Sequence, residues 1–257
     1  MAYAITQNKF APKCAEYKNT NTENSHSIAF DKCNFRCAFC GLTRKRRTNL
    51  KNYSAEEFEE KVKQLIKQGR SFKFTGGEPT LNPDLARDLK IAKKYGGKIY
   101  LDTNASNPEK IKALANDGLI DVIGISLKGL SADEAVKTAG IANKKLCWDN
   151  VFETIDFLAE QPNIRTIITY VLTKPEETEQ TLEKFAELLK PYPHVYIKIN
   201  NLFPNDVASE NGLSPLKEDC YFAELKKFVS RHPEYKGRII LIPSMDAMTN
   251  YSAIEFY

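Results

Sequence analysis

The sequence of 257 residues lacks any apolar run near the ~18 residues that a membrane-spanning helix needs. Its most apolar stretches, residues 166–172 and 238–243, have only the length of strands. The N-terminus has no apolar segment of the kind found in signal peptides, so we expect a cytoplasmic protein with no membrane partner. The net charge is also small: 37 Lys and Arg against 33 Asp and Glu give +4. This excess of positive charge is too small to indicate a nucleic-acid partner.

Repeats, low-complexity tracts and linkers are missing as well. With 42% apolar and 27% charged residues, the composition is that of an ordinary globular chain and excludes a disordered one. Residues 1–24 are polar and lack periodicity, which predicts an N-terminal extension, and residues 25–257 are predicted to form one domain. Six cysteines in a long cytoplasmic chain do not suggest a disulfide framework.

Short β-rich runs alternate with helical patterns after the extension. Strands are expected at residues 27–30, 71–74, 98–101, 121–127, 165–172, 195–199 and 238–242, and helices at residues 54–68, 83–95, 108–116, 131–142, 148–159, 175–189 and 217–230. This order predicts an α/β fold with a mostly parallel sheet and helices outside it, as a complete or partial barrel or as an open doubly wound sheet. In parallel barrels, chemistry gathers at the carboxyl ends of the strands.

Three cysteines lie within eight residues, directly after the first expected strand. Cys33, Cys37 and Cys40 have the spacing C-x3-C-x2-C, so their thiolates can converge on one metal centre. Structural zinc sites usually have four protein ligands, but no fourth Cys or His lies nearby, since His26 precedes the expected strand. Iron–sulfur clusters commonly have four Cys ligands, so three would leave one iron open to a small molecule. An incomplete zinc site and three unrelated buried thiols are the alternatives.

A glycine-rich turn ends the second expected strand. Gly76 and Gly77 permit positive φ and a close backbone approach to a ligand. Glu78 precedes Pro79, which restricts its backbone to extended conformations. A carboxylate fixed at a strand end can pair with the ammonium group of a ligand. Alone, this segment would be an ordinary turn.

Together, the two motifs resemble those of the radical S-adenosylmethionine (SAM) superfamily. Cys33, Cys37 and Cys40 match its C-x3-C-x-aromatic-C motif, with Phe39 in the aromatic place, and residues 76–78 match its Gly-Gly-Glu motif. The resemblance implies a [4Fe–4S] cluster whose open iron is chelated by the amino and carboxylate groups of SAM. It also implies a partial (β/α)6 TIM-like barrel over residues 25–257, and a reductive cleavage that yields methionine and a 5′-deoxyadenosyl radical.

Within that superfamily, the chain resembles the activating enzymes of glycyl-radical enzymes, such as those of pyruvate formate-lyase and anaerobic ribonucleotide reductase. Asp102, Thr103 and Asn104 match the start of a D-T-N-G segment, and Ser126 and Lys128 lie in a segment similar to D-L-K. The segments 138–140 and 170–172 also resemble the corresponding segments of these activating enzymes.

The resemblance implies a monovalent cation near the cofactor carboxylate, beside Asp102 and Thr103. Ser126 stands where an acid is expected, which removes one negative charge from that site. Ala105 replaces the glycine of D-T-N-G, and Gly41 replaces a common His. These departures fit a different partner as well as a different activity.

Two further segments match cofactor-binding positions. Lys128 follows a strand and would reach the carboxylate or ribose of the cofactor, unless it is a surface lysine. Asn200 and Asn201 stand where family members contact adenosine, and asparagine suits an adenine edge. A turn formed by the Asn pair before Pro204 is the alternative.

The other cysteines and a basic run have simpler interpretations. Cys14 is isolated, and Cys147 and Cys220 are expected to be buried. The basic run at residues 44–47 is either a solvated loop or a docking patch for an acidic protein, a peptide leader, an electron donor or RNA. It lacks interleaved aromatic residues, so it is not a nucleic-acid stacking platform. The aromatic tail, residues 251–257, would plug the barrel bottom or cover its mouth.

Three functional hypotheses follow. The first is an anaerobic activating enzyme that abstracts hydrogen from a glycine of a partner glycyl-radical enzyme and receives electrons from a flavodoxin- or ferredoxin-type donor. The second is a radical SAM enzyme that modifies a peptide, RNA or small metabolite, similar to 7-carboxy-7-deazaguanine synthase. The third is a non-catalytic metal-binding interaction protein.

Overall fold

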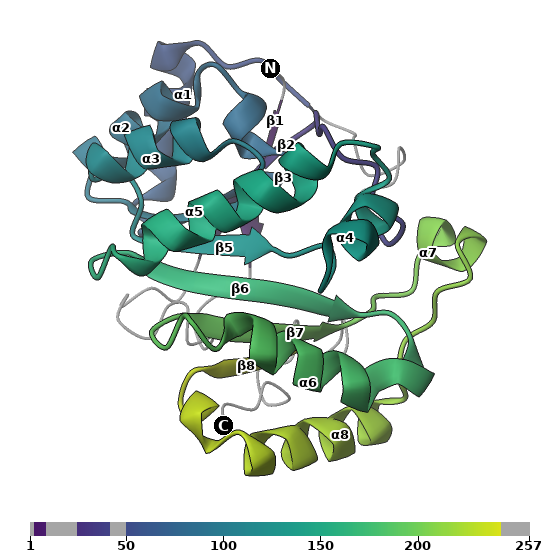
Figure 1. Cartoon of the computed structure of the whole chain (residues 1–257). Coiled ribbons are helices and arrows are strands. Elements are labelled where there is room, and N and C mark those ends of the chain that lie inside the picture. Colours follow the sequence, from purple (N-terminus) through teal and green to yellow (C-terminus); the bar gives the residue numbers. More distant parts are fainter. Residues whose placement is uncertain (1–2, 9–24, 42–49, 243–257) are drawn as a thin grey trace.

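A curved sheet of eight strands forms the centre of the molecule (Figure 1). The structure is a computed structural model and describes residues 3–8, 25–41 and 50–242. In sheet order, which is also sequence order, the strands are β1 (Tyr3–Asn8), β2 (Ser25–Phe30), β3 (Ser71–Gly76), β4 (Lys98–Thr103), β5 (Val122–Ser126), β6 (Arg165–Leu172), β7 (Tyr196–Asn201) and β8 (Ile239–Ile242). Strands β2 to β8 are parallel, and β1 is antiparallel to β2.

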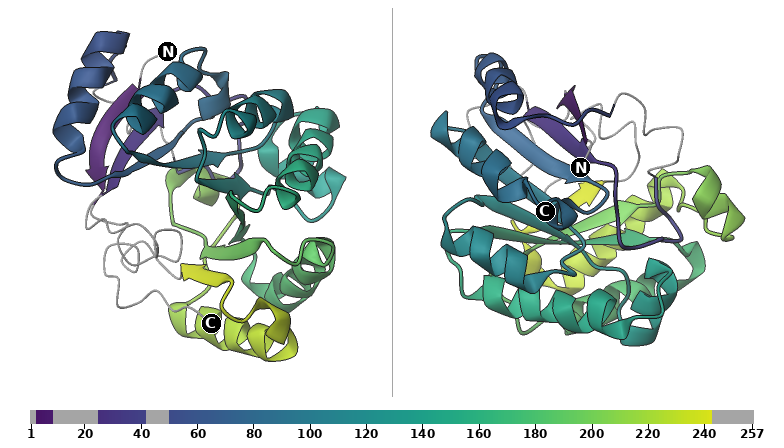
Figure 2. Two further views of the ribbon diagram at one scale, coloured as in Figure 1. Left: turned by 90° about the vertical axis from the view of Figure 1, so that its left-hand side faces the viewer. Right: turned by 90° about the horizontal axis from the view of Figure 1, so that it is seen from above.

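The parallel strands pair only with their neighbours in sequence, which is the strand order of a β/α barrel. In the left view of Figure 2, the sheet curves from β1 and β2 (purple) to β8 (yellow), with helices outside it. Among the described strands, β1 and β8 are the two edges, so the barrel is partial. The predicted partial barrel is confirmed, with seven parallel strands in place of the six that the resemblance implied.

Helices connect the parallel strands. They are α1 (Ala55–Leu65), α2 (Leu85–Lys94), α3 (Pro108–Asn116), α4 (Ala132–Ala139), α5 (Asn150–Ala159), α6 (Thr178–Leu189), α7 (Asp206–Glu210) and α8 (Glu218–Arg231). Local chemistry marks their ends. Ser54 and Glu57 form a reciprocal capping box at the start of α1. Gly140, with a φ of 64°, ends α4 in the left-handed conformation that glycine favours.

The two faces of the sheet differ in chemistry. In β3, Phe72 and Phe74 belong to the hydrophobic core under the helices, so Lys73 and Thr75 lie on the opposite, inner face. The same alternation places polar side chains from other strands on the inner face, namely Asp102, Ser126, Thr169, Lys198 and Asn200. The inside of the barrel is therefore polar near the ends of the strands, where a ligand would bind.

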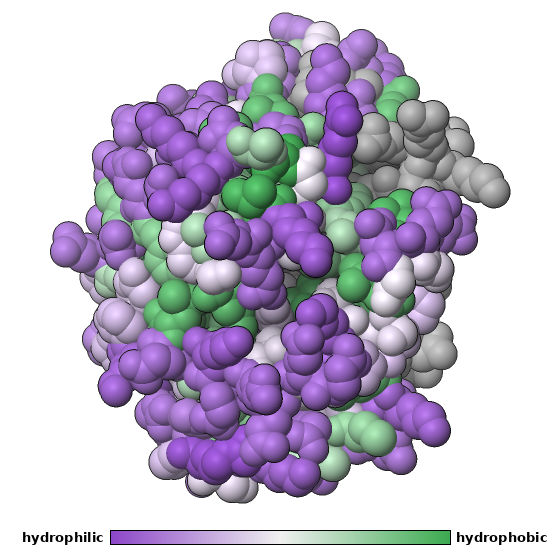
Figure 3. All heavy atoms as spheres, turned by 45° about the vertical axis from the view of Figure 1, so that its right-hand side comes forward, coloured by the Kyte–Doolittle hydropathy of each residue, from purple (hydrophilic) through white to green (hydrophobic). Residues whose placement is uncertain are grey.

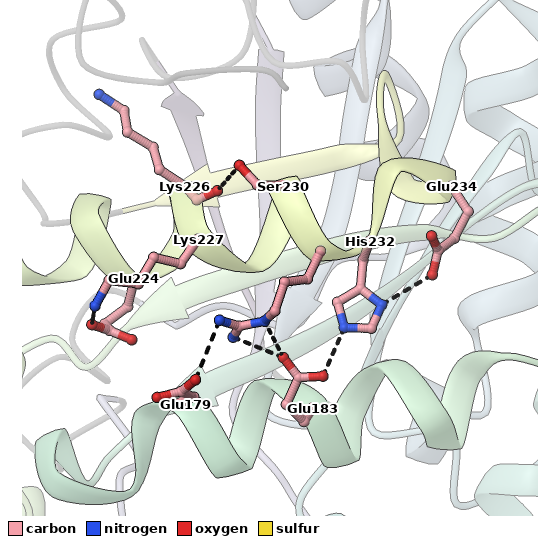
Figure 4. Close-up of polar contacts among 9 residues, drawn as sticks. Glu179, Glu183, Glu224, Lys226, Lys227, Ser230, His232 and Glu234 are labelled. Carbon is pink, nitrogen blue, oxygen red and sulfur yellow. Dashed lines mark hydrogen bonds and ion pairs between the residues drawn. The ribbon is translucent and has the colours of Figure 1, made fainter.

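Ion pairs connect α6 and α8 on the outside of the barrel (Figure 4). The Glu183 carboxylate lies 2.8 Å from a guanidinium nitrogen of Arg231 and 2.8 Å from Nε2 of His232. The other ring nitrogen of His232 faces Glu234 at 3.1 Å. Beneath these groups, the rings of Phe228 and Tyr235 stack. The C-terminal helix is thus held by both apolar packing and charge.

Several elements differ from expectation. Strand β1 lies within the predicted extension, and the short helix α7 was not predicted. His26 lies inside β2 and not before it, where its Nε2 is 3.0 Å from the Gly69 carbonyl oxygen. Cys147 is buried as expected. The expected burial of Cys220 is wrong, because the buried stripe of α8 starts at Tyr221 and leaves its neighbour exposed.

Some expectations lie outside the described residues: Cys14, the basic run at residues 44–47 and the aromatic tail at residues 251–257. The domain boundary after residue 24 stays a prediction. In the part of the chain that the structure describes, no helix combines the length and the apolar character needed to cross a membrane.

Candidate active site

The three cysteines lie on the loop after β2, which we call the cysteine loop (residues 31–41), and helix α4 holds this loop in place. Phe35 is buried in an apolar cluster that includes Ala139. The backbone N–H groups of Arg36 and Ala38 donate to the carbonyl oxygens of Ala139 and Thr138, at 2.8 and 2.9 Å. Two hydrogen bonds and one buried ring therefore fix the segment between the first and last cysteine.

Gly140 allows this close contact. A Cβ atom at this position would lie 2.4 Å from the Arg36 carbonyl oxygen. Residues 138–140 were part of the resemblance, but their contact with the cysteine loop is a tertiary one that the sequence does not display.

A chain of polar side chains joins the cysteine loop to the loop after β4. Asn34 donates to the Ser106 hydroxyl at 2.8 Å, and Asn104 donates to the Asn34 side-chain oxygen at 2.8 Å. Between Asn104 and Ser106, Ala105 has a φ of 58°, the single positive φ of a non-glycine among the described residues. Asn104 was predicted as a site residue, whereas Asn34 and Ser106 were missed because only the fold brings them together.

Gly76 and Gly77 pack against the backbone of the chain itself. The N–H groups of Gly77 and Glu78 donate to the carbonyl oxygens of Phe30 and Lys32, at 2.8 and 2.7 Å. A Cβ atom on Gly77 would lie 2.0 Å from the Lys32 carbonyl oxygen. The absence of side chains on these glycines therefore lets their backbone approach the start of the cysteine loop closely. A contact of the glycines with a ligand stays a prediction.

Glu78 is fully buried, and both its carboxylate oxygens accept hydrogen bonds. One oxygen accepts from the backbone and hydroxyl of Thr80, at 3.0 and 2.7 Å, and from the Thr103 hydroxyl at 2.7 Å. The other accepts from the Asn104 N–H at 2.7 Å. Burial raises the pKa of Glu78, while these donors act in the opposite sense. Glu78 thus links the ends of β3 and β4, and its pairing with a ligand ammonium group stays a prediction.

Asp102 lies inside the barrel and faces positive charge. Its Oδ2 is 3.1 Å from the Lys73 ammonium and accepts from the Thr75 hydroxyl at 3.0 Å. Burial opposes ionisation, but the charges of Lys73 and Lys198 outweigh it and lower the pKa of Asp102. The carboxylate is therefore ionised at neutral pH.

Lys128 connects β5 to the cysteine loop. Its ammonium donates to the Ser126 hydroxyl and lies 5.2 Å from the centre of the Phe39 ring. Its charge also favours the thiolate forms of Cys33 and Cys37. Lys128 is thus beside the cysteines and not on a remote surface, although its contact with a cofactor stays a prediction.

Asn200 and Asn201 both belong to β7, so they do not form a turn. The side chain of Asn201 points away from the barrel interior, where it donates to the Leu216 carbonyl at 2.8 Å and accepts from the Leu216 and Leu202 N–H groups. Asn200 lies on the inner face, and its buried side-chain oxygen has no hydrogen-bond partner. Of the two asparagines predicted to contact adenosine, Asn200 lies inside the barrel and Asn201 does not; the contact itself stays a prediction.

The three cysteines of the cysteine loop are the donor type that an iron–sulfur cluster needs, but in the described part of the chain they do not form a preassembled metal site. Cys33, Cys37 and Cys40 form no disulfide. Cys33 is exposed at the surface, but the loop around it partly desolvates its thiol and raises its pKa to about 11. Burial also raises the pKa of Cys37, so binding of iron must displace the protons of both thiols. In a [4Fe–4S] cluster each thiolate binds a different iron, so three thiols on one loop leave one iron for a small ligand.

Curated relatives carry several activities. A putative glycyl-radical enzyme activating enzyme of Methanocaldococcus jannaschii is 27% identical over 72% of both chains. An S-adenosylmethionine-dependent nucleotide dehydratase of Flammeovirga pacifica is 26% identical over 86% of this chain and 75% of its own. A probable GTP 3′,8-cyclase of Thermococcus kodakarensis is 30% identical over 49% of this chain, and the match spans only 42% of the cyclase.

Solved structures share the fold at low identity. Streptococcus suis SuiB bound to S-adenosylmethionine has a TM-score of 0.64 at 18% identity, over 95% of this chain and 56% of SuiB. Archaeal TYW1 has a TM-score of 0.57 at 16% identity, over 96% of this chain and 90% of its own.

A comparison with models of protein families shows which family the chain belongs to. The model of the Radical SAM superfamily matches residues 27–189, more than half of the chain, from within β2 to the end of α6. The cysteine loop and the turn at residues 76–78 both lie within this match. The chain therefore belongs to the radical SAM superfamily, whose enzymes use a [4Fe–4S] cluster and S-adenosylmethionine.

Proposed function

We propose that this radical SAM enzyme activates a glycyl-radical enzyme by abstracting a hydrogen atom from a glycine of that partner. The observation that carries the proposal is the segment 102–104, typical of such activating enzymes, at the end of β4. Through Asn104, this segment is hydrogen-bonded to both Glu78 and the cysteine loop. The similarity to the Methanocaldococcus jannaschii relative, over 72% of both chains, supports the proposal.

The residues of the chain have distinct roles in this proposal. Cys33, Cys37 and Cys40 would hold the cluster, and the Lys128 ammonium and Asn200 amide would bind SAM. When bound, the cluster and SAM supply the reductive cleavage that produces a 5′-deoxyadenosyl radical. Because that radical reacts with any nearby C–H group, the closely packed loops after β2, β3 and β4 have to position the substrate hydrogen with little freedom.

An acidic flavodoxin- or ferredoxin-type protein is the proposed electron donor. Lys32 and Arg36 are exposed on the cysteine loop. Positive charge around a redox centre attracts and orients an acidic partner. Figure 3 brings forward the side of the molecule at which β5 and β6 end, and hydrophilic side chains predominate there. A polar, transient interface fits such a face.

The experiment is 5′-deoxyadenosine formation by the anaerobically reconstituted protein with dithionite and SAM. It is run with protein-sized and small-molecule fractions of host extract. Stimulation by the large fraction that is lost after protease treatment, together with a glycyl-radical signal in the partner, is the expected result. A partner whose radical-bearing glycine is replaced by alanine is the control and should give no signal. Stimulation by small molecules alone would overturn the activating role.

A nucleotide-modifying enzyme is the second candidate. The similar cyclase and dehydratase are named for nucleotide chemistry, and the match to the dehydratase spans 86% of this chain and 75% of its own. Stimulation of 5′-deoxyadenosine formation by one nucleoside triphosphate, with no effect of the protein fraction, would favour this candidate.

A further inference from the structure

The side chains implied as a monovalent cation site fit a bound ion poorly, because at least one oxygen of each is already paired within the chain. Oδ2 of Asp102 lies 3.1 Å from the Lys73 ammonium and accepts from the Thr75 hydroxyl. A metal ion at this oxygen would have to displace both donors and would lie beside an ammonium group of the same charge.

The other two positions are engaged as well. The Thr103 side chain faces away from the inside of the barrel, where its hydroxyl donates to Glu78 at 2.7 Å and accepts from the Ala105 N–H at 3.0 Å. The Ser126 hydroxyl accepts from the Lys128 ammonium. Each of the three side chains of the implied site therefore has a protein partner, and two of the three, Asp102 and Ser126, are paired with a lysine.

Lys73 is held in its position by the fold. It rises from the inner face of β3, and its ammonium lies 4.5 Å from the centre of the Tyr100 ring on the neighbouring strand. Its side chain is only 19% exposed. Tyr100 itself lies across Gly124, where a Cβ atom would come within 2.3 Å of the Tyr100 hydroxyl. Strands β3, β4 and β5 together confine the ammonium to the side of Asp102.

We propose that the Lys73 ammonium takes the place of a monovalent cation beside Asp102, so that SAM binding by this enzyme needs no added metal ion. Lys73 acts here as a positioning residue: it neutralises Asp102 and keeps a fixed positive charge at the end of the barrel that receives SAM. The proposal rests on the family's use of SAM and is independent of the substrate, whether protein or nucleotide.

The test measures SAM affinity of the reconstituted full-length protein in tetramethylammonium buffer, with K⁺ or Na⁺ added at constant ionic strength. We expect the wild-type affinity to stay unchanged. The Lys73→Met variant keeps the apolar stem and exposes the Asp102 carboxylate, so we expect its affinity to fall about tenfold without K⁺ and to recover when K⁺ is added. Lys73→Arg, which keeps the charge, should behave like wild type.

Two controls separate this role from a structural one. The double variant Lys73→Met with Asp102→Asn has neither charge, so K⁺ should not restore its affinity. Lys90→Met changes a lysine that is 61% exposed on α2 and should leave affinity and K⁺ response unchanged. Thallium(I) NMR reports the site directly: we expect specific Tl⁺ binding to Lys73→Met and none to wild type.

Two results would overturn the proposal. One is a wild-type affinity that rises several-fold with K⁺ or Na⁺, or specific Tl⁺ binding to wild type. The other is a folded Lys73→Met variant whose weakened affinity is not restored by K⁺. If Lys73→Met fails to fold, the measurements of SAM affinity and Tl⁺ binding on the wild type still test the proposal. Because SAM binding is read without substrate, the result is separate from the success of the proposed function.

Discussion

The backbone N–H of Arg36 donates to the carbonyl oxygen of Ala139, the last residue of α4, at 2.8 Å. The cysteine loop is therefore attached to the end of a helix that begins directly after the β5 segment. In the next residue, Gly140, the left-handed φ disfavours a side chain, and the closeness of the Arg36 carbonyl leaves no room for a Cβ atom. The position of the cysteines thus depends on one glycine outside both sequence motifs.

Gly140→Ala should lower the stability of the protein and its retention of iron. The left-handed φ costs an alanine about 1–2 kcal/mol, and its Cβ would have to push the Arg36 backbone away, at a further cost of about 1–3 kcal/mol. The matched control is Gly118→Ala, because Gly118 has a φ of 66° and open space around it. Thermal unfolding and iron content of both variants are the measurements. If the two variants lose equal stability, the contact with Arg36 has no energetic weight.

Cys37→Ala should abolish cluster binding, whereas Cys220→Ala should leave it intact. Cys37 is half-buried on the cysteine loop, and Cys220 is exposed on α8, on the other side of the barrel wall. We expect about four iron and four sulfide per chain in the wild type and in Cys220→Ala, and almost none in Cys37→Ala. Iron and sulfide analysis with the visible absorption spectrum provides the check. A full iron content in Cys37→Ala would refute the cluster ligands assigned here.

Much of the fold could be predicted from the sequence, because its elements carry local signals. β6 is a continuous run of β-branched and apolar residues, and α1 has a complete capping box at Ser54. β1 escaped prediction because its short polar run gains strand structure only by pairing with β2. Cys220 was misplaced because one residue along a helix changes the exposed face, which helical periodicity resolves only approximately.

The site was predictable in its residues but not in its connections. Spacing indicated the cysteines and Glu78, yet two of the donors to Glu78, Thr103 and Asn104, come from the end of another strand, 25 and 26 positions along the sequence. The role of Lys73 could not be predicted from the sequence, because a single lysine within an apolar strand is common. Only the pairing of β3 with β4 brings it to Asp102.

Glu78→Gln should destabilise the protein by roughly 2–4 kcal/mol. The amide replaces one acceptor oxygen by a donor that then faces other donors, from Thr80 and Thr103 or from Asn104, in a fully buried place. Glu109→Gln is the control, because Glu109 is 83% exposed at the start of α3 and should change stability by under about 0.5 kcal/mol. Urea unfolding of the two variants measures the difference. Equal midpoints would mean that Glu78 does not connect β3 and β4 energetically.

The ion pairs between α6 and α8 should make stability depend on acid pH (Figure 4). The hydrogen bond from His232 holds the pKa of Glu183 below its usual range, despite partial burial and with help from Arg231. A carboxyl whose folded-state pKa is lowered contributes stability that is fully present above its unfolded-state pKa and lost as the pH falls through the folded-state value. The loss should therefore begin near pH 4.5 and continue below it.

Glu183→Gln should remove this acid-dependent contribution. At about pH 7 the variant should be less stable than wild type by at most about 1 kcal/mol, because the pair is partly exposed to solvent. The difference should disappear as the pH falls through the lowered folded-state pKa of Glu183. Salt should shrink the difference at pH 7, since it screens exposed charges. Glu187→Gln, on the same helix but 78% exposed, should show neither effect. Urea unfolding across this pH range gives the comparison. A difference between Glu183→Gln and wild type that stayed constant down to pH 3 would mean that packing at this position, and not its charge, joins α6 to α8.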